Sequence, residues 1–433
     1  MAWYRKLHWQ IIIGLILGLV WGLIASQAGW GEFNNDYIAP IGTIFVNLLK
    51  LIAVPLVLAS LIVGVTSLND ITRLSRMGGK TVGLYMITTV LAITIGLISV
   101  NVIQPGKSLP PETREQLTAS YSQNAQDKSV GVDEVADRGL IDFIVDIVPE
   151  NIFQAFSDNG SMLQVVFIAI LIGIGIMQIP SEKSKVLISF FDGFNDVIIK
   201  IVDYIMILAP YGVFALIAQV INDLAGDDLG KALELLSALG WYCVAVLAGL
   251  FLHVLLVYSS IFKLFSKMSL RDFFRAMRPA ILLGFSTSSS SATLPVTMER
   301  AEKNLGVDEE VSSFVLPVGA TINMDGTSLY QAVAAVFIAQ ALGMDLSIGQ
   351  QLSIVVTALL ASVGSAGVPG AGIIMLVIVL QSIGVPVEGI ALILGVDRIL
   401  DMVRTAVNIT GDAAVTVAVA SSEGQLGEMH FDD

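Results

Sequence analysis

The sequence predicts an all-α polytopic membrane protein, and three observations support this class. Of the 433 residues, 55% are hydrophobic and only 14% are charged, whereas soluble domains carry about 25% charged residues. Apolar runs long enough to cross a bilayer recur along the chain. In the second half, stretches rich in Ser, Gly and Pro interrupt these runs, which is typical of re-entrant segments buried in a membrane protein.

The apolar runs give the expected helices in chain order. The first six lie at 9–28, 42–67, 81–104, 160–180, 193–222 and 235–262. Irregular apolar stretches follow at 279–298, 309–342 and 348–382, and a last helix is expected over 387–420. Between 140 and 160, acidic residues alternate with Ile, Phe and Val, which indicates a broken or interfacial helix.

The N-terminus has some features of a signal peptide, because Arg5 and Lys6 precede an apolar run and Ser26-Gln27-Ala28 follows it. Cleavage would delete the first of a whole series of spans. We therefore interpret this run as the first transmembrane helix.

Basic residues indicate the orientation in the membrane. Fourteen of the 23 Lys and Arg residues fall in the short segments 5–6, 73–80, 183–185, 263–278 and 300–303, whereas the opposite segment 29–40 holds none. By the positive-inside rule we expect both termini in the cytoplasm and the acidic loop 105–139 outside. This loop is rich in Pro, Glu, Ser, Gln and Asp, which favours a flexible insertion. The expected location is a cell membrane, the bacterial inner membrane.

Cysteine, histidine and net charge exclude several functions. Cys243 is the only cysteine, so the chain has no intramolecular disulfide and no thiolate zinc site, and we interpret Cys243 as a packing residue. His8, His253 and His430 are scattered, which gives no support to a histidine metal cluster. The net charge is −14, so no nucleic-acid partner is expected.

The last expected helix carries one polar stripe. Asp397, Asp401, Arg404, Asn408 and Asp412 fall within an arc of about 80° at 100° per residue. One charge at the bilayer centre costs roughly 2.5–3.5 kcal/mol, so this stripe predicts a pathway or a binding site for a polar solute. The alternative for Asp401 and Arg404 is an internal i, i+3 salt bridge that only neutralises buried charge.

Two interrupted segments predict the tips of helical hairpins. Segment 284–297 reads GFSTSSSSATLPVT and segment 362–374 reads SVGSAGVPGAGII. Irregular backbone at membrane depth is tolerated only inside protein or beside a wet cavity. Such pairs of broken segments indicate a transporter binding site. The alternative is that the small residues only pack helices together.

A third interruption lies between the two tips. Residues 317–327 contain one Pro, two Gly, Asn323 and Asp325, which should unwind a membrane helix. Freed carbonyls, an amide oxygen and a carboxylate suit a hard cation such as sodium. A structural kink alone would explain Pro and Gly but not Asp325.

Four motifs resemble one transporter family. NMDGT at 323–327, SSSSATLP at 288–295, GSAGVPGAG at 364–372 and DRILDMVRTAVNITGD at 397–412 closely resemble those of the dicarboxylate/amino acid:cation symporters. That family includes the animal excitatory amino acid transporters and archaeal and bacterial aspartate and glutamate transporters. The motifs have the family's order and spacing, and the resemblance covers essentially the whole chain.

The resemblance implies eight transmembrane helices plus two re-entrant helical hairpins, arranged as inverted repeats in an elevator-type transporter that forms a homotrimer in the lipid bilayer. The implied scaffold comprises 1–77 with spans 1 and 2, and 140–232 with spans 4 and 5. The implied transport domain comprises 78–104 with span 3, and 233–420 with span 6, both hairpins and spans 7 and 8. The acidic loop 105–139 and a cytoplasmic tail at 421–433 complete the chain, and the second hairpin acts as the gate.

The family's substrate-binding roles transfer to matching residues. Arg404 is expected to clamp the side-chain carboxylate of the substrate with its planar fork of donors, and Asp401 to receive the α-ammonium. Ser290, the backbone of the first tip and Asn408 would hold the α-carboxylate. The implied substrate-binding set is Ser288, Ser289, Ser290, Thr327, Ser365, Val368, Gly372, Asp401, Arg404, Thr405 and Asn408.

Co-transported sodium is implied in the same way, with no organic cofactor. Asp412 with carbonyls of Gly319, Asn323 and Asn408 would form one site. Thr321 with Ser362, Val363 and Ser365 would form a second as the gate closes. Tyr85, Thr88 and Thr89 with Asn323 and Asp325 would form a third. The implied cation set is Tyr85, Thr88, Thr89, Gly319, Thr321, Asn323, Met324, Asp325, Ser362, Val363, Ser365, Asn408 and Asp412.

Individual positions narrow the expected substrate. Relatives that carry C4-dicarboxylates lack an aspartate at position 401, and relatives that carry neutral amino acids lack an arginine at position 404, so this chain is expected to carry aspartate or glutamate. Animal members have a proton- and potassium-linked glutamate where this chain has Gln331, so we expect neither potassium countertransport nor a proton carried there. Ser288 and Met402 stand where other members carry an arginine, which leaves affinity and kinetics open.

Three alternatives remain beside a sodium-coupled symporter. The nearest is a proton-coupled glutamate/aspartate symporter of the same fold. A dedicated anion channel would not need the pair of Asp401 and Arg404. A serine hydrolase using Ser288–Ser291 would need a base, and only His253 lies in a membrane segment, so we expect no enzyme. The sequence does not decide whether the substrate is aspartate or glutamate, or whether it is the L or the D form.

Overall fold

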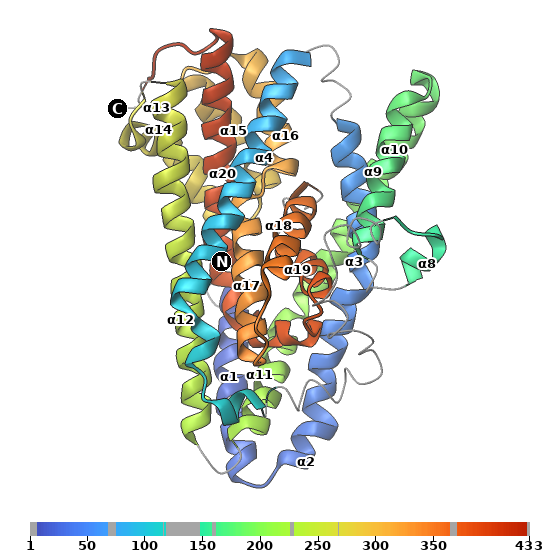
Figure 1. Cartoon of the computed structure of the whole chain (residues 1–433), viewed down its shortest axis with the longest axis vertical. Coiled ribbons are helices and arrows are strands. Elements are labelled where there is room, and N and C mark those ends of the chain that lie inside the picture. The colour runs from blue at the N-terminus through green and yellow to red at the C-terminus, as the bar shows by residue number, and fades with distance from the viewer. Residues whose placement is uncertain are drawn as a thin grey trace.

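The computed structural model describes residues 7–67, 75–115, 117, 148–157, 162–225, 229–266, 268–363 and 370–430. Within these ranges the structure is nearly all helical and contains no strand, apart from an isolated bridge between Val307 and Leu426. The all-α class is therefore confirmed. Helices α4, α12 and α20 gather on one side of an elongated molecule, and α3, α9 and α10 on the other (Figure 1).

The first half of the chain contains long apolar helices and several short helical turns between them. They are α1 (Leu7–Gln27), α2 (Gly31–Phe33), η2 (Asn34–Ile38), α3 (Ala39–Ser67), α4 (Ser75–Ile103), η4 (Pro105–Ser108), α8 (Ile152–Ser157), α9 (Met162–Gln178), α10 (Ser181–Ile207) and α11 (Ala209–Ala225).

The second half is more broken. It contains α12 (Leu229–His253), η6 (Val254–Tyr258), α13 (Ser259–Phe265), α14 (Leu270–Thr287), α15 (Ser290–Lys303), α16 (Glu309–Ile322), α17 (Asp325–Ala341), α18 (Ile348–Val363), α19 (Ala371–Ser382), η7 (Val387–Leu392) and α20 (Leu394–Glu423).

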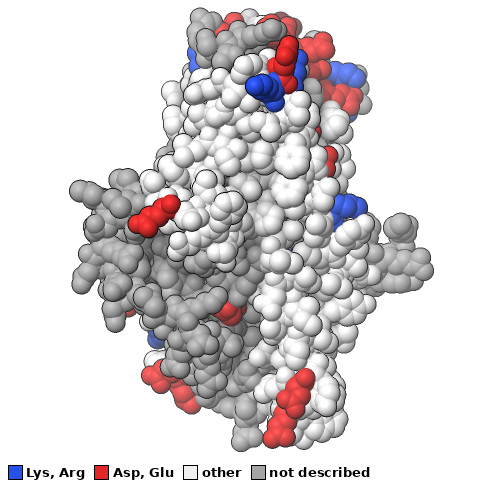
Figure 2. Space-filling model, turned by 90° about the vertical axis from the view of Figure 1, so that its right-hand side faces the viewer, with Lys and Arg blue, Asp and Glu red and all other residues white. Residues whose placement is uncertain are grey.

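Four helical stretches among the described residues are long and apolar enough to cross a membrane: Trp9–Gln27, Gly31–Val63, Met77–Ser108 and Leu233–Phe265. A bent pair, Ser181–Ile207 and Ala209–Asn222, makes a fifth if it counts as one span. The described surface in Figure 2 is largely uncharged between its ends, and the blue Lys and Arg side chains gather mainly at its upper end. These features indicate a multi-pass membrane protein.

Close approach of α1 and α11 depends on a stripe of glycines. A methyl group added at Gly14, Gly18 or Gly22 would lie 2.3, 2.4 or 2.7 Å from a backbone carbonyl oxygen of α11. Glycines four residues apart lie on one face of a helix and let two backbones touch. This contact holds the N-terminal helix against the middle of the chain.

The apolar run expected over 193–222 is divided between two helices. Helix α10 begins earlier, at Ser181, and α11 begins at Ala209, with a bend of 53° between them. Pro210 lies at the start of α11, where it has no N–H to donate to the preceding turn. Apolar periodicity continues through the bend, so hydropathy alone does not reveal it.

The interruption at the first expected tip is present. Helices α14 and α15 pack against each other and against α20. Ser288, between them, has a left-handed backbone with φ of 52°. Ser289 then caps α15, because its hydroxyl accepts the N–H of Ala292 at 3.1 Å. The chain therefore reverses as a helical hairpin at 288–289.

Two further interruptions follow. The NMDGT segment separates α16 from α17 at Asn323 and Met324, as the sequence predicts. Helices α18 and α19 pack together, and the second expected tip at 364–369 lies outside the described residues. The last helix, expected from 387, begins as an α-helix only at Leu394 and follows the 3-10 helix η7.

The predicted cytoplasmic tail is partly attached to the first hairpin. The N–H of Gly427 donates to the carbonyl of Gly306 at 2.7 Å, and the N–H of His430 to that of Asn304 at 3.0 Å. Of the predicted acidic loop, residues 105–115 are described and η4 packs against α12 and α17; residues 118–139 lie outside the described part. In the expected helix at 140–160, the described helical residues are those of α8.

Candidate functional site

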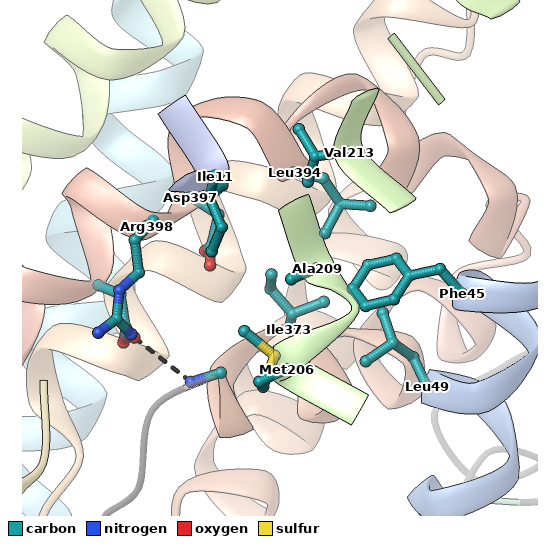
Figure 3. A pocket seen from close by; sticks show the side chains of 12 residues that line it. Ile11, Phe45, Leu49, Met206, Ala209, Val213, Ile373, Leu394, Asp397 and Arg398 are labelled. Atoms are coloured by element: carbon teal, nitrogen blue, oxygen red, sulfur yellow. Dashed lines mark hydrogen bonds and ion pairs between the residues drawn. The ribbon is translucent and has the colours of Figure 1, made fainter. Parts of the chain in front are cut away.

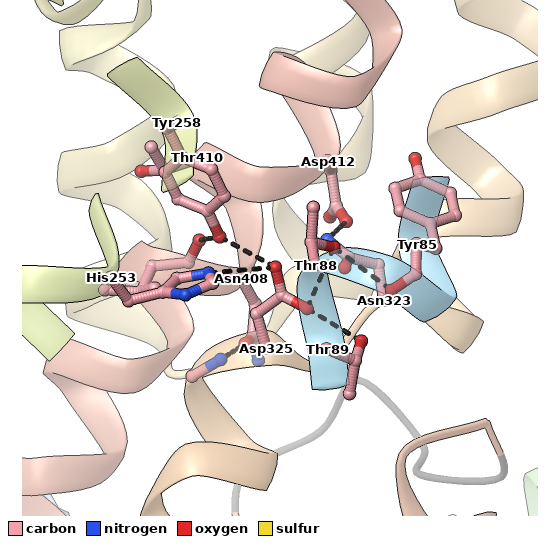
Figure 4. A network of polar contacts seen from close by, with 12 residues as sticks. Tyr85, Thr88, Thr89, His253, Tyr258, Asn323, Asp325, Asn408, Thr410 and Asp412 are labelled. Carbon is pink, nitrogen blue, oxygen red and sulfur yellow. Dashed lines mark hydrogen bonds and ion pairs between the residues drawn. The ribbon is translucent and has the colours of Figure 1, made fainter. Parts of the chain in front are cut away.

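Asp325 is the centre of a buried polar network. It is the first residue of α17 and is fully buried. Its Oδ1 accepts the hydroxyls of Thr89 at 2.7 Å and Thr88 at 3.2 Å, both from α4. Its Oδ2 lies 3.1 Å from Nε2 of His253 and accepts the hydroxyl of Tyr258 at 3.1 Å (Figure 4). The weak Tyr85-x-x-Thr88-Thr89 pattern therefore does place two hydroxyls on Asp325.

His253 and Tyr258 were not among the predicted site residues. The π-helix η6 follows His253 and ends at Tyr258, and its wider turn brings residues five apart onto one side. Their rings meet edge to face, with centroids 4.8 Å apart. A histidine inside a membrane segment is itself a functional signal, and the sequence reading used it only as a possible base for a hydrolase. In the structure its Nε2 is directed at Asp325.

Asn323 and Asp412 form a second buried pair. Nδ2 of Asn323 donates to Oδ1 of Asp412 at 2.8 Å, whereas Oδ1 of Asn323 is buried without a partner. A methyl group at Gly319 would lie 2.4 Å from the hydroxyl of Tyr85 and 2.8 Å from Asp412. Glycine at 319 thus lets oxygen-bearing side chains from α4 and α20 approach the end of α16. An unpartnered amide oxygen beside a carboxylate and a hydroxyl suits a hard cation.

In the other predicted cation site, the described hydroxyls bond carbonyls of their own helices. The hydroxyl of Thr321 donates to the carbonyl of Val318 at 3.0 Å, and that of Ser362 to the carbonyl of Leu359 at 2.7 Å. Val363 ends α18, and Ser365 lies outside the described residues.

Arg404 is held by two carboxylates and an aromatic ring. The side chain is 1% exposed. Its Nη1 donates to Asp397 at 2.7 Å and its Nε to Oδ1 of Asp401 at 3.0 Å. The guanidinium carbon lies 4.0 Å from the ring centre of Tyr330. The internal ion pair that the sequence left open for Asp401 is therefore present, and a shorter contact to Asp397 accompanies it.

Several predicted substrate residues surround this arginine. Oδ1 of Asn408 accepts the N–H of Gly326 at 2.7 Å, and its Nδ2 donates to the hydroxyl of Thr327 at 3.1 Å. A methyl group at Gly372 would lie 2.8 Å from Nη2 of Arg404 and 3.2 Å from Thr327. The start of α17, the start of α19 and the middle of α20 thus meet at one place.

The remaining predicted residues have the following places. Ser288, Ser289 and Ser290 are buried at the first tip, and Thr405 is buried on α20. The sulfur of Met324 accepts a hydrogen bond from Asn408 at 3.3 Å. Ser365 and Val368 lie outside the described residues.

The sequence analysis missed three neighbours of the predicted pair. Asp397 belonged to the polar stripe without a role, and Tyr330 and Arg398 were not singled out. The stripe geometry could have identified Asp397, because it lies one turn from Asp401. Within the described ranges, no group of three or more His, Cys, Asp or Glu side chains could hold a metal ion. Any cation here would depend on hydroxyl, amide and backbone oxygens as well as carboxylates.

Buried carboxylates, an arginine and unpartnered oxygens inside a multi-pass helical fold are the features of a membrane transporter. The chain belongs to the sodium:dicarboxylate symporter family, whose model matches residues 7–422. The predicted family resemblance is therefore confirmed.

Three relatives illustrate the range of the family. The chain is 37% identical to the "proton/sodium-glutamate symport protein" of Bacillus caldotenax over 427 residues, which cover 98% of this chain and 96% of the relative. It is 35% identical to the "C4-dicarboxylate transport protein" of Bacillus subtilis (strain 168), with 99% and 96% covered. It is 36% identical to "excitatory amino acid transporter 3" of Mus musculus, with 99% and 88% covered. Identity alone does not separate these substrates.

Proposed function

We propose that this protein is a secondary active symporter that takes up aspartate, glutamate or both, driven by co-transported sodium. The observation that carries the proposal is the placement of Asp401 and Arg404 side by side on α20, with Nε of Arg404 3.0 Å from Asp401. A carboxylate and a guanidinium in one buried pocket complement the ammonium and the side-chain carboxylate of an acidic amino acid. A C4-dicarboxylate offers no ammonium for Asp401.

Binding would rearrange the ion pairs of Arg404. The guanidinium turns from Asp401 towards the substrate's side-chain carboxylate, which frees Oδ1 of Asp401 to accept the ammonium. Asn408 and Ser290 hold the α-carboxylate, and Thr327 contacts the side-chain carboxylate. Ser288, Ser289, Thr405 and the second tip with Gly372 enclose the amino acid.

Two cation sites follow from the oxygen clusters. Asp325 with Thr88 and Thr89 would hold one sodium ion, and Asp412 with oxygens of Asn323 and Gly319 another. Thr321 with the end of α18 would complete a third when the second hairpin closes. Each positive charge carried inward gains about 2.3 kcal/mol per 100 mV of membrane potential, so co-transported cations can drive the uptake of an anionic amino acid.

The proposed architecture has eight spans and two re-entrant hairpins in an inverted repeat. The transport domain, which contains α4, α12 and the helices α14–α20, moves as an elevator against a scaffold that contains α1, α3 and α9–α11. We propose a homotrimer in the cell membrane with both termini in the cytoplasm. The polar groups described above all lie within the proposed moving part.

The test is uptake of radiolabelled L-aspartate and L-glutamate into proteoliposomes under an inward sodium gradient or an inward proton gradient, at matched voltage. Uptake driven by sodium alone is expected. No uptake of either amino acid under any gradient would refute the substrate class.

Proton coupling is the second candidate, because the name of the Bacillus caldotenax relative includes both ions. Uptake driven by protons alone would keep the fold and the substrate pocket. It would assign proton transfer, not sodium binding, to buried carboxylates such as Asp325 and Asp412.

A further inference from the structure

Arg398 is a buried arginine for which the proposed mechanism has no role. It lies on α20 between Asp397 and Asp401 and is 7% exposed. Its Nη1 donates to Oδ2 of Asp401 at 3.3 Å, whereas its Nε is buried without a partner. A buried donor without a partner is unfavourable. The hydrogen bonds that Arg398 makes here therefore do not by themselves explain why an arginine is buried at this position.

The surroundings of Arg398 differ from those of Arg404. Arg398 and Asp401 line a narrow cavity between α20 and the helices α1, α3, α10 and α11, whose side chains there are apolar (Figure 3). Met206 and Phe45 are among these apolar neighbours. Arg404 instead lies on the side of Thr327 and Gly372. The two arginines therefore reach Asp401 from different directions.

The two oxygens of Asp401 have separate partners. Oδ1 faces Arg404, with Nε at 3.0 Å and Nη2 at 2.9 Å. Oδ2 accepts the N–H of Gly370 at 3.3 Å and Nη1 of Arg398 at 3.3 Å. When Arg404 turns to a substrate carboxylate, Oδ1 becomes free. Oδ2 remains held from the cavity side, so the carboxylate keeps its orientation.

The charge balance of the buried side chains also supports separate roles for the two arginines. Asp397 and Asp401 balance Arg398 and Arg404, and all four are at most 7% exposed. An acidic amino acid adds a net charge of about −1 at neutral pH. Without Arg398 the buried set would already be negative before the substrate arrives, and an unpaired buried charge is strongly unfavourable.

We propose that Arg398 is a positioning residue of the substrate site: it holds Oδ2 of Asp401 so that Oδ1 faces the substrate's ammonium. This inference rests on the proposed function. Other members of the family carry an arginine at the position of Ser288 or of Met402, and this chain carries neither. Arg398 supplies a second guanidinium beside Asp401 from α20 itself.

The test compares Arg398→Met, which keeps length but removes charge, with Arg398→Lys, which restores a positive charge. The first readout is the Kd for L-aspartate at saturating sodium, measured on purified protein by isothermal titration calorimetry. The second is the Kd for sodium without amino acid, measured from the rise in Tm with sodium concentration. Arg300→Met is the matched control, because Arg300 is a partly buried arginine whose Nη1 bonds Asn304 at the base of the first hairpin.

We expect Arg398→Met to weaken L-aspartate binding by about tenfold to a hundredfold, as for other partners that orient a binding group. Arg398→Lys should recover part of this loss, and the sodium Kd should stay at the wild-type value in both variants and in the control. If Arg398→Met does not fold, Arg398→Gln replaces it in the same comparison. An unchanged aspartate Kd, or equal losses of aspartate and sodium affinity without recovery by lysine, would overturn the positioning role. Failure of the wild-type protein to bind L-aspartate would instead refute the proposed function.

Discussion

Replacing Arg404 with cysteine tests the carboxylate clamp and the buried charge balance together. Arg404 neutralises two buried carboxylates, with Nη1 2.7 Å from Asp397 and Nε 3.0 Å from Asp401. Arg404→Cys leaves these carboxylates with Arg398 alone, a net charge of −1 in a site that is almost fully buried. Breaking a buried ion pair by removing one partner costs about 3–5 kcal/mol. We expect a loss of folding stability of this size.

Binding of an acidic amino acid should fall as well. A hydrogen bond to a charged group contributes about 1.5–3 kcal/mol, and the guanidinium of Arg404 offers two such donors to one carboxylate. Loss of both predicts about 3–6 kcal/mol, which is a factor on the order of 10² to 10⁴ in Kd for L-aspartate. Neutral amino acids have no side-chain carboxylate and lose neither bond, so the preference should shift towards them.

The assay is competition of unlabelled L-aspartate and L-serine against a labelled amino acid, together with thermal unfolding of the purified protein. Adding Asp397→Asn to Arg404→Cys removes the surplus negative charge, so the double variant should regain stability but not aspartate affinity. Arg300→Met is the control and should bind aspartate as the wild type does. Unchanged aspartate affinity in Arg404→Cys would refute the clamp, and no gain in stability from Asp397→Asn would refute the charge balance.

Three further substitutions address the other parts of the site. Asp401→Ser should abolish amino acid uptake, because the ammonium loses its carboxylate; wild-type uptake rates in proteoliposomes would contradict this role. Thr89→Val keeps the side-chain shape but removes the hydroxyl that donates to Asp325 at 2.7 Å, and we expect roughly tenfold weaker sodium binding from the loss of one charged contact. Sodium-dependent Tm shifts measure this, and an unchanged sodium Kd would exclude Thr89 from the cation site. Gly326→Ala places a methyl group 2.5 Å from the carbonyl oxygen of Arg404, and such overpacking should cost about 1–3 kcal/mol; a wild-type Tm would show that α17 and α20 separate freely.

The sequence predicted the helices well wherever a helix ends at the same place as an apolar run. The breaks at Ser288 and at Asn323 were predictable because Ser, Gly, Pro and Asn cluster inside apolar sequence. The bend between α10 and α11 was missed, because hydrophobic residues continue through it and only Pro210 marks the change. Proline is common in the first turn of a helix, so Pro210 alone does not predict a bend between two helices.

The site was predictable where contacts are local and less so where they are not. Asp397, Asp401 and Arg404 share one face of one helix, so their spacing predicted one polar stripe and offered the pair of Asp401 and Arg404, although the contact of Asp397 with Arg404 was not predicted. The contact of His253 with Asp325 joins residues 72 positions apart, and the π-helix after α12 brings Tyr258 to the same carboxylate. No spacing rule along the chain predicts such a contact.

The NMDGT segment explains how cation and substrate binding can be coupled. Within this short break, Asn323 contacts Asp412, Asp325 accepts the hydroxyls of α4, and the N–H of Gly326 donates to Asn408 at 2.7 Å. A cation bound at Asp325 or at Asn323 would therefore fix the backbone that, in the proposed mechanism, positions Asn408 beside the substrate. Because coupling between two sites is reciprocal, the factor by which sodium tightens aspartate binding must equal the factor by which aspartate tightens sodium binding. The break itself consists only of Asn323 and Met324, between the end of α16 and the start of α17, so both proposed cation clusters would act on the same short stretch of backbone that bonds Asn408.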